Sequence, residues 1–139
     1  SEIILQNKEK IKVFGIDDPY FHCGSASEIK YATDSLCSFL EVNKNEFNIL
    51  LAHHPEQIEI YSQYNFDMVY SGHAHGGQGR IFGLGLIAPD QGFFPKYTSG
   101  LYEENGTKLI VSRGIGNSII PIRFNNRPEI VVAELKPVT

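Results

Sequence analysis

The sequence predicts a mixed α/β fold in one domain. Two short apolar runs, 47–52 and 67–72, have the composition of strands that are covered on both faces, and a helical segment separates them. The 139 residues are enough for one hydrophobic core, and 42% apolar with 20% charged residues is typical of a folded globular chain. We therefore treat 1–139 as a single domain, with helices early in the chain and antiparallel strands late.

In the first third of the chain we predict two strands, at 2–5 and 11–16, joined by a turn at 6–10. A helix is predicted after them, at 25–42. Pro19 follows the second strand and stops regular pairing there. Ser25 and Glu28 have the spacing of a capping box, so the helix is expected to begin at Ser25. Apolar residues at helical spacing then continue it to about Val42.

The middle of the chain predicts a strand–helix–strand unit. Pro55 is suited to the first turn of a helix, which we expect to run to about Gln63. Two covered strands joined by a helix form a parallel crossover. The carboxyl ends of strands 47–52 and 67–72 should therefore lie at the same edge of the sheet.

The last part of the chain changes in character. Residues 81–96 are rich in Gly and Pro and have no clear period, which predicts a long ordered loop. A hairpin is expected across 97–114, with Asn105-Gly106 as its tight turn. A final strand is predicted at 129–135.

Four of the five histidines follow the two parallel strands, at His53, His54, His73 and His75. Open α/β sheets bind ligands beyond the carboxyl ends of their strands, and neutral imidazole is the commonest protein ligand for transition metals. Glycines at 72, 76 and 77 would let the backbone turn sharply and pass close to a bound ion. We predict that His53, His73 and His75 bind divalent metal at this edge.

Four further residues are candidates for contact with a substrate. Asp17 and Asp18 end a strand, although local capping explains an Asp-Asp-Pro turn equally well. Arg113 and Asn117 follow another strand and would offer guanidinium and amide donors to a phosphate. A glycine-bordered turn with no such role is the alternative for this pair.

The segments LLAHHPE, DMVYSGHAHGGQ, YTSGLY, VSRGIGNS and PIRFNNRPEI occur in this order. Together they resemble the C-terminal half of a calcineurin-like metallophosphoesterase, in the bacterial subgroup whose Gly-His-x-His is followed by Gly-Gly-Gln. The resemblance runs from about Phe14 to Leu135. It implies the C-terminal half of a four-layer α/β/β/α sandwich with a mixed sheet. It also implies hydrolysis of phosphomonoesters or phosphodiesters with two divalent ions, whether Mn, Fe or Zn.

The resemblance makes His53 and His73 ligands of one ion and His75 a ligand of the other. His54 matches no ligand position, so we expect it to be an ordinary neighbour of the site or a surface residue. The family's Asp-x-His, Gly-Asp and Gly-Asn-His-Asp/Glu motifs are absent from this sequence. They would supply the bridging aspartate and the histidine that protonates the leaving group, so the catalytic residues are unknown.

A chain that carries only part of the family's metal-binding motifs should differ from the complete enzyme in activity and assembly. We expect the chain to bind at most one ion, weakly, and to have negligible phosphatase activity, because neutral imidazoles do not offset two dications. The absence of an initiator Met leads us to expect that an N-terminal half of the same polypeptide is missing. Strand edges meant for that half should favour self-association. The alternative is a non-catalytic half-domain that acts as a protein-interaction or assembly module.

Charge and hydropathy limit the other possible partners. The formal net charge is −4, and only a thin basic group, Arg113, Arg123 and Arg127, gathers in the last third. Non-specific nucleic-acid binding rests on clustered Lys and Arg, so we expect none. The sequence has no targeting segment and no apolar run of the ~18 residues that a membrane span needs. These features leave open whether the protein is cytoplasmic or membrane-associated in a bacterium.

Overall fold

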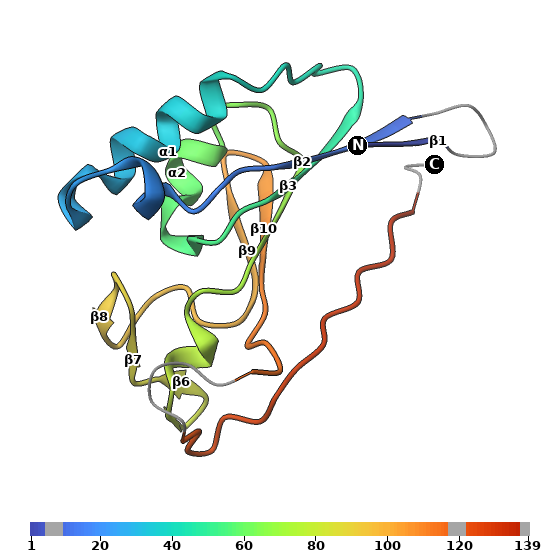
Figure 1. Ribbon diagram of the computed structural model, residues 1–139. Helices are drawn as coiled ribbons and strands as arrows, with labels where there is room; N and C mark the ends of the chain where they lie inside the picture. Colours follow the sequence, from blue (N-terminus) through green and yellow to red (C-terminus); the bar gives the residue numbers. More distant parts are fainter. Residues whose placement is uncertain (5–9, 117–121, 137–139) are drawn as a thin grey trace.

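The computed structural model describes residues 1–4, 10–116 and 122–136, and it has a mixed six-stranded sheet with helices on one face (Figure 1). The strands of this sheet are β1 (Glu2–Ile4), β2 (Lys10–Gly15), β3 (Phe47–Leu51), β4 (Met68–Ser71), β9 (Gly100–Glu104) and β10 (Thr107–Val111). Their order is β1-β2-β3-β4-β10-β9. The four central strands are parallel, and the two edge strands are antiparallel to their neighbours. The predicted α/β class and the parallel crossover from β3 to β4 are confirmed.

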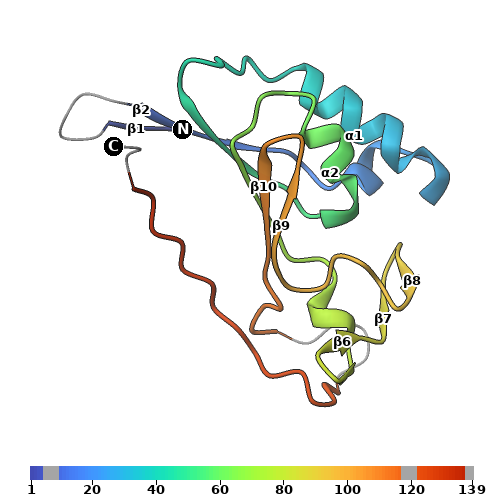
Figure 2. The same cartoon turned by 180° about the vertical axis from the view of Figure 1, so that it is seen from behind.

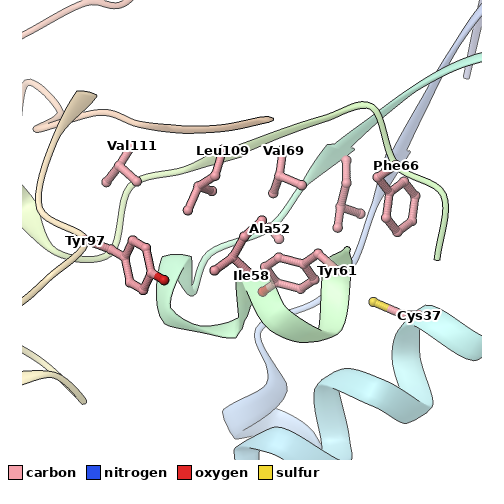
Figure 3. Packing of buried hydrophobic residues seen from close by; sticks show 10 residues of the cluster. Cys37, Ala52, Ile58, Tyr61, Phe66, Val69, Tyr97, Leu109 and Val111 are labelled. Carbon is pink, nitrogen blue, oxygen red and sulfur yellow. The ribbon is translucent and has the colours of Figure 1, made fainter. Parts of the chain in front are cut away.

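The helices are α1 (Ile29–Ser38) and α2 (Ile58–Tyr61), with four 3-10 turns: η1 (Pro19–His22), η2 (Ala26–Glu28), η3 (Pro55–Gln57) and η4 (His75–Gly77). Side chains from alternate positions of β3, β4 and β10 pack against the helices (Figure 3): Leu50, Val69, Leu109 and Val111 against Cys37, Ile58 and Tyr61. Burial of this apolar surface is the main stabilising contribution. Among the described residues, the helices are too short and too polar to span a membrane.

Both predicted helices are shorter than expected. Helix α1 begins at Ile29, and its predicted capping box does not form. The Glu28 side chain accepts a hydrogen bond from the Gly24 backbone N–H at 2.9 Å, and the Ser25 hydroxyl contacts the Ser27 hydroxyl instead of capping the helix. Residues Ala26–Glu28 form the 3-10 turn η2. The prediction for Pro55 is confirmed, since it begins η3, which leads into α2.

The segment predicted as a long ordered loop contains two small antiparallel pairs. Their strands are β5 (Arg80–Ile81) with β6 (Leu84–Gly85), and β7 (Ile87–Ala88) with β8 (Gly92–Phe93). Positive φ angles at Phe82, Asp90 and Phe94 turn the chain back on itself. The next hairpin, β9–β10, matches the prediction: Asn105 and Gly106 have φ angles of 49° and 86°, as its tight turn requires.

The strand predicted at 129–135 does not form. Residues 129–136, here called the C-terminal arm, are extended but pair with no strand among the described residues. The backbone N–H of Glu129 donates to the carbonyl of Gly114, which ties down only the start of the arm. Both views show the arm running past the sheet on the side away from α1 and α2 (Figures 1 and 2). An apolar, β-branched sequence forms a strand only where a neighbouring strand accepts it.

Candidate metal centre

The histidines gather where the central parallel strands end. His53 and His54 follow β3, and His73 and His75 follow β4. Backbone hydrogen bonds continue the pairing of these segments beyond the strands, because Ala52 N–H donates to Tyr70 O at 3.0 Å and His73 N–H to His53 O at 3.3 Å. The four histidines therefore lie at the carboxyl ends of β3 and β4, the edge of the sheet that the sequence predicted.

His53 and His73 face each other directly. His53 Nε2 and His73 Nδ1 are 2.8 Å apart, and the ring centroids are separated by 4.4 Å. Two imidazole nitrogens at this distance repel each other unless one carries a proton or both share a cation. Burial and the neighbouring His73 lower the pKa of His53. A low pKa keeps the imidazole neutral, which is the form that binds metal.

Asp90 completes the surroundings of His73. Its Oδ2 lies 2.9 Å from His73 Nε2, and its Oδ1 accepts a hydrogen bond from the Tyr20 hydroxyl. That bond raises the pKa of Tyr20 to about 12. Neither Asp90 nor Tyr20 was a candidate from the sequence. The only local signal was an aspartate in a Pro-Asp-Gln-Gly turn, where its positive φ of 59° is tolerated.

His54 is fully buried, so the surface alternative for this residue is wrong. Its Nδ1 lies 2.7 Å from Glu56 Oε1, and its Nε2 lies 3.1 Å from Asp18 Oδ1. Burial acts to lower the pKa of His54, but the two carboxylates outweigh burial and raise it. The ring packs 4.4 Å from the His73 ring, centroid to centroid, which makes His54 a direct neighbour of the site.

The two neighbouring aspartates have different surroundings. Asp17 has a side chain that is 80% exposed and lies 3.5 Å from His22. Asp18 instead reaches the histidine cluster: it contacts His54, lies 3.8 Å from His53 Nε2, and accepts a hydrogen bond from the Tyr20 backbone N–H. Burial alone would raise the pKa of Asp18, but the Tyr20 N–H and His54 lower it overall.

His75 lies apart from this cluster. No contact joins its ring to His53 or His73 in the described part of the chain, and its buried Nδ1 has no partner there. Burial and the charge of Arg123 lower its pKa. The adjacent glycines allow close protein contacts: a Cβ at Gly76 would collide with Asn126 and Arg113, and one at Gly77 would meet the Gly85 backbone.

The other predicted substrate contacts lie elsewhere. Arg113 forms a two-pronged ion pair with Glu129, through Nε at 3.1 Å and Nη2 at 3.2 Å. The Arg113 backbone N–H also donates to Glu129. Together these contacts lower the pKa of Glu129 despite its partial burial. Asn117 lies outside the described residues.

His54, His73 and Asp90 could hold one metal ion. Each offers a ligand atom, and these atoms lie within 4.8 Å of one another. Ligands about 2.0–2.2 Å from one ion are at most about 4.4 Å apart, so shifts of a few tenths of an ångström would complete the geometry. Imidazole and carboxylate suit Zn, Fe and Mn. His54 would first have to release a carboxylate, because both its ring nitrogens are engaged.

Several bacterial proteins resemble the chain in sequence. It is 40% identical over 91 residues to the uncharacterized metallophosphoesterase YkuE of Bacillus subtilis, covering 65% of this chain and 31% of the relative. It is 38% identical over 107 residues to the uncharacterized metallophosphoesterase Cj0846 of Campylobacter jejuni, covering 76% and 27%. It is 34% identical over 88 residues to the phosphodiesterase YaeI of Escherichia coli, covering 63% and 32%.

These relatives are all longer than the chain. The chain spans a third or less of the length of the three relatives, at 31%, 27% and 32%. No family model matches the chain, and no solved structure matches it. Homology to metal-dependent enzymes agrees with a cluster of imidazoles and a carboxylate that could hold an ion. Over most of its length, this chain is homologous to bacterial metallophosphoesterases.

Proposed function

We propose that the chain is the C-terminal half of a dinuclear metal-dependent phosphoesterase domain of the calcineurin-like type. The complete domain would be a four-layer sandwich that hydrolyses phosphomonoesters or phosphodiesters. The observation that carries the proposal is the facing pair His53 and His73, 2.8 Å apart at the ends of β3 and β4, in a chain homologous to metallophosphoesterases. Asp90 on the far nitrogen of His73 adds the negative charge that cation binding needs.

In the proposed site His53 and His73 hold one ion and His75 holds the second, with manganese, iron or zinc as the metal. Bound divalent ions supply activation of water and stabilisation of charge on the phosphoryl oxygens. The chain's own residues position the ligands: Asp90 orients the His73 ring through Nε2, while His73 Nδ1 faces His53. Carboxylates that hold metal-ligating imidazoles in this way fix ring orientation and raise ligand basicity.

By itself the chain is proposed to bind one ion weakly and to turn over almost no substrate. Imidazoles are neutral, and Asp90 is the one carboxylate in the group that could hold an ion, against the four charges of two dications. We expect calorimetric titration with Mn²⁺ or Zn²⁺ to show at most one site, and His73→Ala to remove it. His22→Ala is the matched control, because His22 lies in η1 next to Asp17 rather than in the cluster.

Activity is measured on the same samples with p-nitrophenyl phosphate and bis-p-nitrophenyl phosphate. Turnover indistinguishable from that of the His73→Ala variant is expected. Two tight metal-binding sites would contradict the proposal that this chain carries only half of the dinuclear site. So would turnover that His73→Ala abolishes and His22→Ala preserves. Binding that survives His73→Ala would contradict the assignment of the cluster.

The open face of the sheet favours a second role, as an assembly surface. Leu51 and Leu101 are 49% and 64% exposed on the face away from α1 and α2. A groove of about 600 Å³ lies there between the strand ends and the C-terminal arm. We propose that the missing half of the domain covers this face, and that the chain alone self-associates through it. Light scattering tests this, and a monomer at every concentration would contradict it.

A further inference from the structure

A second pocket lies beside the turn that carries His75. It encloses about 470 Å³ and is lined by Arg113, Arg123, Asn125, Asn126, Arg127 and Pro128. The Asn126 amide donates to the backbone carbonyls of His75, at 2.6 Å, and Gln78, at 3.1 Å. The pocket therefore shares a wall with η4. Both views show the chain after residue 122 passing close to β6 and η4 (Figures 1 and 2).

The Arg113 guanidinium is held by contacts within the protein. Its guanidinium makes two hydrogen bonds to the Glu129 carboxylate, which balances its charge. Arg113 was the arginine that the sequence predicted for phosphate contact. An arginine already held by a carboxylate in a two-pronged pair has few donors left for an anion.

The positive charges of Arg123 and Arg127 are not neutralised by a carboxylate in the described part of the chain. Neither forms an ion pair there, although the chain has a formal net charge of −4. Arg123 Nη2 donates to the backbone carbonyls of Arg113 and Gly116, which hold the guanidinium in place. Its Nη1 is buried and has no partner among the described residues. A buried charged donor without a partner is costly unless a ligand satisfies it.

We propose that Arg123 and Arg127 bind a second phosphate group of the substrate, separate from the phosphoryl group that reacts at the histidine cluster. The substrate class is therefore a phosphoester with at least two phosphoryl groups. Guanidinium groups are suited to this task because their planar donors match phosphate oxygens. The pocket's role toward a substrate rests on the proposed phosphoesterase function, whereas anion binding is a property of this chain and is testable without turnover.

The test is calorimetric titration of the whole chain with inorganic pyrophosphate, in buffer with EDTA so that no divalent ion contributes. We expect saturable binding, weakened about 10- to 100-fold by Arg127→Gln and by Arg123→Gln, which is the loss typical of a charged hydrogen bond. Arg127 is exposed, so its replacement leaves the fold intact even if Arg123→Gln does not. Arg127→Lys should restore part of the affinity by keeping the charge.

Two control variants show whether pyrophosphate binds in this pocket. Lys108→Gln removes one exposed positive charge from β10, outside the pocket, and should leave the affinity unchanged. His22→Ala should also leave it unchanged, because His22 lies in η1 next to Asp17. Undetectable binding, unchanged affinity in Arg127→Gln, or an equal loss in Lys108→Gln or His22→Ala would each overturn the proposal. The metal titrations bear on the proposed function and do not decide this result.

Discussion

The two faces of the central sheet differ most at β3, although the same strands build both. On the helix-covered face Leu50, Val69, Leu109 and Val111 are completely buried. On the open face Leu51, the next residue of β3, is 49% exposed. In the C-terminal arm, which runs along that side, Ile130 and Val132 are 80% and 87% exposed.

The contrast bears on β3, whose residues Ile49, Leu50 and Leu51 are apolar in succession instead of alternating with polar residues. A continuous run is the pattern of a strand covered on both faces. Helices α1 and α2 cover one face, and no second layer covers the other among the described residues. A contiguous exposed apolar face marks an interaction surface. A partner layer over the open face would cover Leu51 and Leu101, whereas Met68 and Ile110 on that face are already only 7% exposed.

The largest expected effect comes from comparing Leu50 with Leu51. Leu50→Ala leaves a cavity under α2 and should lower the free energy of unfolding by about 3 kcal/mol or more. Leu51→Ala removes the same atoms from the open face and should cost about 1 kcal/mol or less. Urea denaturation followed by circular dichroism measures both. Equal losses would mean that the open face is packed in solution.

A smaller effect is expected where the C-terminal arm is attached. Glu129→Gln breaks the ion pair with Arg113 and should cost about 1.5 kcal/mol at pH 7. The pKa of Glu129 is lowered in the folded protein, so its contribution is fully present above its unfolded pKa of about 4.3 and is lost as pH falls through the folded pKa. The difference between parent and variant should therefore shrink below about pH 4.

The matched control for this pair is Glu134→Gln. Glu134 and Lys136 form an ion pair whose side chains are 77% and 72% exposed. Replacing Glu134 should change the free energy of unfolding by at most about 0.5 kcal/mol at any pH. If Glu129→Gln behaves like Glu134→Gln in thermal unfolding from pH 3 to pH 7, the arm is not held by this pair.

The smallest effect on stability is expected from Val132→Glu. Val132 is almost fully exposed, so the free energy of unfolding should change by about 0.5 kcal/mol or less. The same substitution places a charge on the surface proposed for self-association and should shift the chain toward the monomer in light scattering. An unchanged assembly would show that the arm is not part of the contact.

Local sequence signals located much of the histidine cluster. Strand-like runs before His53 and His73, together with the rule for parallel crossovers, placed these residues at one edge, and their rings are in contact. They did not select Asp90, which lies in a turn between β7 and β8. Positive φ angles and two short strand pairs bring this turn back to the histidines, and local patterns do not predict that path. They also did not show that Arg113 is held by Glu129, a residue sixteen positions away.

The sequence by itself determined the α/β class, the parallel unit of β3 and β4, the β9–β10 hairpin, and the strand-end position of the histidines. These features follow from apolar periodicity and turn chemistry, which act over a few neighbouring residues. The tertiary structure alone decided that Asp18, Glu56 and Asp90 surround His54 and His73, that the 129–135 segment pairs with no strand in the described part of the chain, and that Arg123 and Arg127 line a pocket. Those features depend on which distant segments come together, and short-range patterns do not encode that choice.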